Sequence, residues 1–279
     1  MRILKVAALA LALSPAISMS HAAYAAAANP SIEFEKMTWP EVKAALAAGK
    51  TTALFYTGGV EQRGPQNGNG GHNLMAQATV KMIAERLGNA IAMPVMPFTP
   101  NNASADLPGT IGLTPELLGA VLERISEQAI QTGFKNVVIM GDHGGGQPKV
   151  YQDVAAKLEA KYAPQGIHVF YCDDVYIKAG ADFDRILAER GYPPTSHGGI
   201  TDTSLMMYLD KNNEYVRREL VPVTNGDPVP KAGEKPVRTL NNGITGDPRR
   251  STAELGKEEL EHKVGFAVKQ IQGFIPPKK

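Results

Sequence analysis

The 279-residue sequence is poor in cysteine and in net charge: it has a single cysteine and a formal charge of +1. One thiol, Cys172, cannot form an intramolecular disulfide, so a packed core must stabilise the fold. Cys172 ends the apolar run 167–172, which favours a small core residue over a nucleophile. A near-neutral chain without long charge blocks argues against nucleic acid or an anionic membrane surface as the main partner.

The N-terminus lacks an apolar run long enough to span a membrane. Residues 6–19 form an apolar stretch that Ser14 and Pro15 interrupt, and this stretch falls short of the about 20 residues that a spanning helix needs. A positive start and the small residues Ala23-Tyr24-Ala25 are typical of a signal peptide with its cleavage site. We expect residues 1–25 to be removed on export to a bacterial periplasm, with no membrane contact afterwards; an N-terminal anchor or a core helix is the alternative.

Strand-like and helix-like segments alternate over the first two thirds of the mature chain. Apolar, often β-branched runs predict strands, and apolar residues at helical spacing predict helices between them. Four strand–helix repeats of this kind indicate an α/β fold, a three-layer αβα arrangement whose mostly parallel sheet has helices on both faces. Residues 26–279 are expected to form a single domain. The expected strands are 51–57, 90–97, 136–141 and 167–172, and the expected helices are 40–48, 72–87, 114–132 and 149–162.

The rest of the chain is less regular. Helices are expected over 182–190, 202–210 and 257–272. Between the last two lies the segment 221–250, which is rich in proline, glycine and asparagine. A segment of this length is too long for an ordinary connection and predicts either a functional lid or an oligomer contact.

Two strand ends carry residues that suit a metal ion. Glu61 follows the first strand in a glycine-rich loop, and His72 begins the next helix eleven residues later. His143 follows another strand, before three glycines that lack the P-loop lysine pattern. Because the ends of parallel strands share one edge of a sheet, the three side chains can meet. One carboxylate and two imidazoles are a common ligand set for a zinc-type ion that keeps a position open for water.

Four blocks of the sequence, in the same order and at similar spacing, resemble the creatininase (creatinine amidohydrolase) family. The first resembles the family pattern Glu-Gln-His-Gly-Pro-His with an aspartate eleven residues after the glutamate. The resemblance spans about residues 50–210 and is too ordered for chance. The blocks are Gly59-Val60-Glu61-Gln62-Arg63-Gly64-Pro65 with His72, Leu107-Pro108-Gly109-Thr110-Ile111-Gly112-Leu113-Thr114-Pro115-Glu116, Gly141-Asp142-His143-Gly144-Gly145-Gly146, and Ser196-His197-Gly198-Gly199-Ile200-Thr201-Asp202-Thr203-Ser204.

The resemblance implies an α/β fold, often assembled into hexamers, with a two-metal site that hydrolyses amide bonds of small or cyclic compounds. By position, Glu61 and His143 match ligands of one metal, and His197 matches a histidine implicated in proton transfer. Asp202 stands where the family has a glutamate that acts as a ligand or supports one. We therefore expect a homo-oligomer with a small-molecule substrate.

Two departures from the family pattern point to a single metal ion per chain. Arg63 replaces a ligand histidine, and arginine stays protonated and cannot bind a cation. His72 replaces the aspartate expected to bridge two metals. With these two changes, we expect Glu61, His72 and His143 to surround one divalent ion, zinc or alternatively manganese. Arg63 then holds a substrate carboxylate or a developing oxyanion, or forms a salt bridge with Asp142 or Asp202.

The sequence predicts a metal-dependent hydrolase that cleaves a C–N bond of a small amide or lactam. A metal-activated water would attack the carbonyl, with Arg63 as oxyanion partner, His197 as proton donor and Asp202 supporting the site. The same site would serve a lactone or an ester. The alternative is a non-catalytic periplasmic relative that binds a small ligand or a metal.

Overall fold

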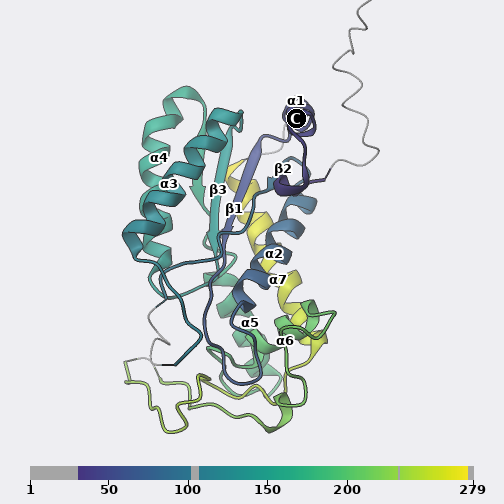
Figure 1. The fold of residues 1–279 in the computed structure, drawn as a ribbon, viewed down its shortest axis with the longest axis vertical. Coiled ribbons are helices and arrows are strands. Elements are labelled where there is room, and N and C mark those ends of the chain that lie inside the picture. Colours follow the sequence, from purple (N-terminus) through teal and green to yellow (C-terminus); the bar gives the residue numbers. More distant parts are fainter. Residues whose placement is uncertain (1–30, 102–106, 232, 276–279) are drawn as a thin grey trace, which may run out of the picture.

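The computed structural model describes residues 31–101, 107–231 and 233–275 (Figure 1). The predicted signal peptide, residues 1–25, lies outside these residues and stays a prediction. Among the helices described, none combines the length and the apolar character that crossing a membrane requires.

A parallel sheet of four strands forms the middle layer. The strands are β1 (Thr52–Thr57), β2 (Ala90–Ala92), β3 (Asn136–Gly141) and β4 (His168–Tyr171), in the order β2-β1-β3-β4. Strands buried on both faces read as continuous apolar runs, as β1 and β3 do. The second strand is shorter than predicted because Pro94 and Pro97 have no N–H for a sheet hydrogen bond.

Helices cover both faces of this sheet, which confirms the predicted α/β architecture (Figure 1). Side chains alternate between the faces along β1: Leu54 and Tyr56 pack in one core, and Ala53 and Phe55 in the other. The first core includes residues of α2 (Gly71–Leu87) and α7 (Ala253–Phe274); the second includes residues of α1 (Trp39–Ala47), α3 (Pro115–Thr132) and α4 (Gln147–Tyr162).

Helices α5 (Ile177–Glu189) and α6 (Ile200–Leu209) lie near the end of the sheet where β1 and β3 deliver their loops (Figure 1). Helix α6 packs very closely on α7 at Gly256, where an added Cβ would lie 1.9 Å from the carbonyl oxygen of Ser204. Helix α7 begins four residues before the predicted start, because Thr252 caps it by accepting a hydrogen bond from the N–H of Leu255. The close packing brings the first half of α7 beside the strand ends.

The segment 221–250 begins with the short helix η4 (Val221–Val223) and continues as a long loop beside α5 and α6 (Figure 1). Asp227 fixes its shape by accepting hydrogen bonds from the N–H groups of Leu240 and Asn241. Thr245 pairs with the loop before α6: its carbonyl accepts from Ser196 and its N–H donates to the carbonyl of His197. The segment therefore holds His197 in place, and a lid or oligomer role stays a prediction.

Candidate metal centre

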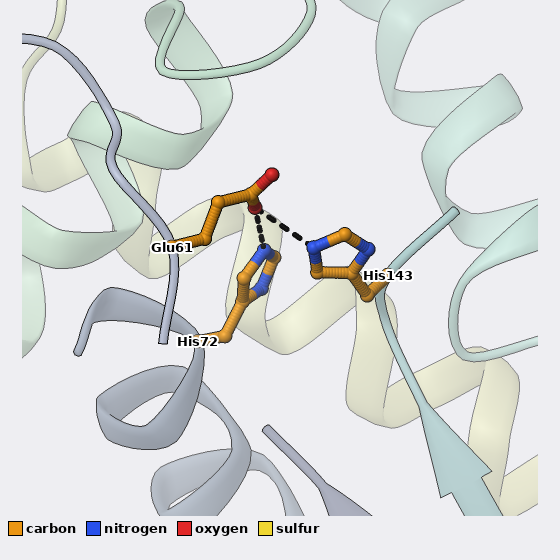
Figure 2. A group of neighbouring side chains, drawn as sticks. All are labelled: Glu61, His72 and His143. Carbon is orange, nitrogen blue, oxygen red and sulfur yellow. Dashed lines mark hydrogen bonds and ion pairs between the residues drawn. The ribbon is translucent and has the colours of Figure 1, made fainter. Parts of the chain in front are cut away.

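Three buried side chains meet beyond the carboxyl ends of β1 and β3 (Figure 2). The Oε2 atom of Glu61 lies 2.8 Å from Nε2 of His143 and 3.2 Å from Nε2 of His72. One ligand atom from each residue lies within 4.8 Å of the other two. The structure thus brings the three predicted ligands together; that they bind a metal stays a prediction.

Each side chain is placed by an element that the sequence pattern had indicated. Glu61 sits in the loop after β1, where its N–H donates to the carbonyl of Asn69 at 2.9 Å. His72 is the second residue of α2, and His143 is the second residue after β3. The N–H of Gly145 donates to Nδ1 of His143 at 3.1 Å, so the ring is held from both sides.

Arg63 is almost fully buried, with an exposed fraction of 1%. Its Nη2 atom lies 2.9 Å from Oδ2 of Asp202 and 3.0 Å from Nε2 of His72. Gly71 makes room for this guanidinium, because a Cβ there would lie 2.9 Å from Nη1 of Arg63. Of the two salt bridges considered from the sequence, the one with Asp202 forms. The guanidinium therefore faces a carboxylate of its own chain and not an open position for a substrate carboxylate.

Asp142 pairs with a lysine that the sequence reasoning missed. The Nζ atom of Lys263, on α7, lies 3.0 Å from Oδ2 of Asp142. The other carboxylate oxygen of Asp142 lies 3.4 Å from Nδ1 of His72. Burial opposes the charge on Asp142, but Lys263 and His72 outweigh it and hold the pKa of this carboxyl far below its usual range. The signal for Lys263 was its position in the apolar stripe of the last helix, between Leu260 and Ala267.

His197 lies at the edge of the cluster. Its Nε2 donates to the carbonyl oxygen of Gln62 at 2.7 Å, and its Nδ1 lies 3.6 Å from Oε2 of Glu61. Burial is the largest influence on its pKa, which lies below the ordinary value for histidine. His197 is therefore neutral at pH 7, with the nitrogen that carries no proton turned toward Glu61.

The buried charges of the centre do not balance. Among the described residues, Asp202 pairs with Arg63 and Asp142 pairs with Lys263, whereas Glu61 contacts the imidazoles of His72 and His143, which carry no permanent charge. Burial and Arg63 oppose protonation of His72, but its contacts with Asp142 and Glu61 prevail and raise its pKa. The cluster thus attracts one further positive charge, which a proton on His72 or a metal ion can supply.

The ligand atoms fit one divalent ion. The Nδ1 of His72 and Oδ1 of Asp142 have no hydrogen-bond partner among the described residues and face each other, so Asp142 suits the N–H of a metal-bound His72. Binding of the ion would break two hydrogen bonds: that of Arg63 to Nε2 of His72, and that of Gly145 to Nδ1 of His143. A second ion beside His72 would have to share its place with the Arg63 guanidinium.

A cavity of about 380 Å³ opens beside the cluster. Its walls include the metal-site residues and also Tyr176, Asp184, Glu259 and Lys263 from the segments around α5 and α7. Sequence reasoning had not placed Asp184 or Glu259 near the site, because no local pattern tells which face of α5 or α7 meets the cavity. A second cavity of about 250 Å³ lies between His197 and residues 227–245.

Known proteins resemble this chain over most of its length. The family model for creatininase, described as creatinine amidohydrolase, matches residues 35–271. Creatinine amidohydrolase from Pseudomonas putida is 26% identical over 264 residues, which cover 89% of this chain and 99% of the relative. A mutant creatininase of the Zn-Zn type shares the fold with a TM-score of 0.70 at 24% identity, covering 89% of this chain and 100% of that one. A structure described as creatininase Mn has a TM-score of 0.70 at 23% identity, with 88% and 100% covered.

Proposed function

The chain belongs to the creatininase family, and from this premise we propose that it is a metal-dependent hydrolase cleaving a C–N bond of a small amide or lactam. The observation that carries the proposal is the buried cluster of Glu61, His72 and His143, whose ligand atoms lie within 4.8 Å of one another and which opens onto a cavity. Buried acidic groups without full compensation are costly unless a cation joins them. A divalent ion meets this need.

We assign one ion to each chain, zinc or manganese. Arg63 supplies a fixed positive charge on the side of His72 that faces Asp202, where a second ion would otherwise sit. Like charges at such short separation repel strongly in a buried site. Among the solved relatives, one is of the Zn-Zn type and another is described as a manganese form, so the single ion is a specific property proposed for this chain.

A bound ion would lower the pKa of a coordinated water to about 7 and polarise the substrate carbonyl. The protein supplies the remaining steps. His197, neutral and next to Glu61, accepts a proton from the attacking water at Nδ1 and returns it to the leaving nitrogen. The Gln62 carbonyl holds Nε2–H of His197 and so keeps Nδ1 as the base. Arg63, fixed by Asp202, adds positive charge next to the developing oxyanion.

Metal content per chain tests this proposal, measured by mass spectrometry on protein purified without added metal. We expect one ion in the wild type and its loss in His143→Ala. His168→Ala is the matched control, because His168 lies on β4 and pairs with Glu159 outside the cluster. Two ions per chain would contradict the assignment of Arg63. No ion even after reconstitution would contradict the hydrolase and support the binding protein instead.

A screen of amides and lactams then tests the reaction, with His197→Asn as the variant. We expect turnover to fall about 10²–10⁴-fold in this variant, while its metal content stays at the wild-type value. Turnover of lactones or esters but not of amides would assign the same site to a lactonase or esterase. The periplasmic location and a homo-oligomer are also proposals. N-terminal sequencing of exported protein tests the first, and the mass of the protein in solution tests the second.

One feature favours the second candidate, a non-catalytic binding protein. In the structure the Nε2 of His72 accepts from Arg63, and His143 has contacts at both ring nitrogens. These three ring nitrogens have hydrogen-bond partners within the protein, so none of them requires a metal ion. Ligand binding without metal and without turnover would favour this candidate.

A further inference from the structure

Thr203 is a buried polar side chain next to the metal centre to which no role has been assigned so far. It lies on α6, one residue after Asp202, and has an exposed fraction of 0%. Its hydroxyl accepts hydrogen bonds from Nε2 of Gln66 at 3.2 Å and from Nδ2 of Asn67 at 2.9 Å. It donates to the carbonyl oxygen of Gly198 at 3.1 Å. Because a hydroxyl has one proton to donate and two lone pairs, Thr203 uses its full hydrogen-bonding capacity here.

These hydrogen bonds join the two loops that carry Glu61 and His197. Gln66 and Asn67 belong to the loop after β1, which also carries Glu61, whereas Gly198 directly follows His197. Gln66 connects the loops a second time, because its Nε2 also donates to the carbonyl oxygen of Gly198 at 2.9 Å. Gln66 and Asn67 are buried as well, so the loss of the hydroxyl would leave their amide groups short of a partner.

The backbone of Gly198 also lies directly against the loop after β1. Its φ is +65°, in the left-handed region that favours glycine, and an added Cβ would lie 2.9 Å from the carbonyl oxygen of Arg63. Its N–H donates to Oδ2 of Asp202 at 2.8 Å, the same oxygen that contacts Arg63. Thr203 therefore adds neutral hydrogen bonds between the loops beside the ion pair of Arg63 with Asp202.

The orientation of the His197 ring depends on how closely these loops are held together. Its Nε2 donates to the carbonyl oxygen of Gln62 at 2.7 Å, and its Nδ1 lies 3.6 Å from Oε2 of Glu61. Both partners lie on the loop after β1, whereas His197 lies on the loop before α6. A wider separation of the loops would weaken the bond to Gln62, which decides which ring nitrogen carries the proton.

We propose that Thr203 is a positioning residue, whose hydroxyl fixes the spacing of the two loops and so keeps His197 in the tautomer with Nδ1 facing Glu61. This inference rests on the proposed hydrolase function, in which Nδ1 of His197 is the base. Thr203 does not line the cavity beside the cluster and acts only through His197.

Nitrogen NMR of the His197 ring tests the inference, with His197→Asn to assign its signals. In wild-type protein at about pH 8, where the ring is neutral, we expect one tautomer with the proton on Nε2. Thr203→Val removes the hydroxyl at nearly constant volume and should give a mixture of both tautomers. Thr203→Ser keeps the hydroxyl and should restore the wild-type spectrum. Thr79→Val is the matched control, because Thr79 is equally buried but donates to the carbonyl of Met75 within its own helix.

Turnover of a substrate found in the amide and lactam screen gives a second readout. Thr203→Val should lower kcat about 10–100-fold, the effect of a slightly misplaced catalytic group, while KM and metal content stay at the wild-type values. If Thr203→Val does not fold, Gln66→Met removes the bonds of that amide to Thr203 and Gly198 and should change the tautomer in the same way.

A single tautomer and an unchanged kcat in Thr203→Val would overturn the inference and leave the hydrolase in place. An equal change of tautomer in Thr79→Val would overturn it too, since the effect would then follow from any buried threonine. Mixed tautomers in Thr203→Val, in a protein without metal or turnover, would support the positioning role and contradict the hydrolase.

Discussion

One guanidinium nitrogen of Arg63 contacts both Asp202 and His72: Nη2 lies 2.9 Å from Oδ2 of Asp202 and 3.0 Å from Nε2 of His72. The lone pair of Nε2 serves either this hydrogen bond or a metal ion, and not both. Metal binding therefore requires the guanidinium to withdraw toward Asp202. Even then the ion pair with Asp202 keeps Arg63 beside the metal site. Arg63 therefore affects both the charge of this site and the free energy of unfolding.

Arg63→Met is expected to lower the free energy of unfolding by about 3 kcal/mol, because Asp202 loses its cation in a largely buried position. Asp202→Asn alone should also destabilise, since it leaves the guanidinium without its carboxylate. The double variant should lose less than the sum of the two, by about 1 kcal/mol or more. Urea unfolding of the metal-free proteins measures this cycle; additive losses would show that the two residues do not interact.

The layers of the fold and the three clustered side chains were predictable from sequence because they follow local patterns. Apolar runs predicted the strands, and parallel strands deliver their following loops to one edge, so Glu61 and His143 had to approach each other. The sequence limited the salt-bridge partner of Arg63 to Asp142 or Asp202 but did not decide between them. That choice depends on how α6 sits over the strand ends, which no local pattern encodes.

Lys263 and Glu259 show where sequence reasoning stops. Both lie on a helix that the periodicity predicted, yet their function depends on which side of α7 faces the strand ends. This is set by the close contact of α6 and α7 at Gly256, a tertiary feature. A lysine within an apolar stripe signals a buried partner, but it does not identify Asp142.

Lys263→Met is expected to weaken metal binding about 10–100-fold, the usual effect of losing a group that supports a ligand. Without Lys263, Asp142 loses its ion pair with a permanent cation, and its hold on Nδ1 of His72 weakens as its pKa rises. Competition with a chelator of known affinity measures the change. Lys257→Met is the control, because Lys257 is on the same helix and exposed. Equal metal affinities in the two variants would show that Lys263 does not support the metal site.

Gly256→Ala is expected to destabilise the protein by about 2 kcal/mol, because the added methyl group overpacks the contact between α6 and α7. The new Cβ would lie 1.9 Å from the carbonyl oxygen of Ser204, so the helices must separate. Gly265→Ala on the same helix has nothing within 4 Å of its Cβ and should instead stabilise. Thermal unfolding compares the two. A drop in stability for both would point to a property of the helix rather than to this contact.

Glu259 is expected to make the metal-free protein less stable as the pH rises from about 5 to 8. Its pKa is about 8 in the folded protein, above the about 4.3 of an unfolded chain. Between these values the folded state binds the extra proton, so the free energy of unfolding falls with rising pH. Burial is the main cause of this raised pKa; Lys263 on the same helix opposes it, and Asp202 on α6, Asp142 after β3 and Asp184 on α5 add to it.

The expected loss across this range is about 2 kcal/mol, less than the full shift would give because Glu259 is only half-buried. Glu61 and Asp142 act at lower pH, where their depressed pKa values make stability fall as the pH drops below about 4. Urea unfolding at a series of pH values, with Glu259→Gln as reference, separates the two effects. In the variant, the free energy of unfolding should not decline between pH 5 and 8, because this decline depends on the Glu259 carboxyl. It should still fall below about pH 4, because that loss depends on Glu61 and Asp142. Parallel curves for the two proteins would mean that Glu259 keeps an ordinary pKa, and that water in the cavity satisfies its buried oxygen.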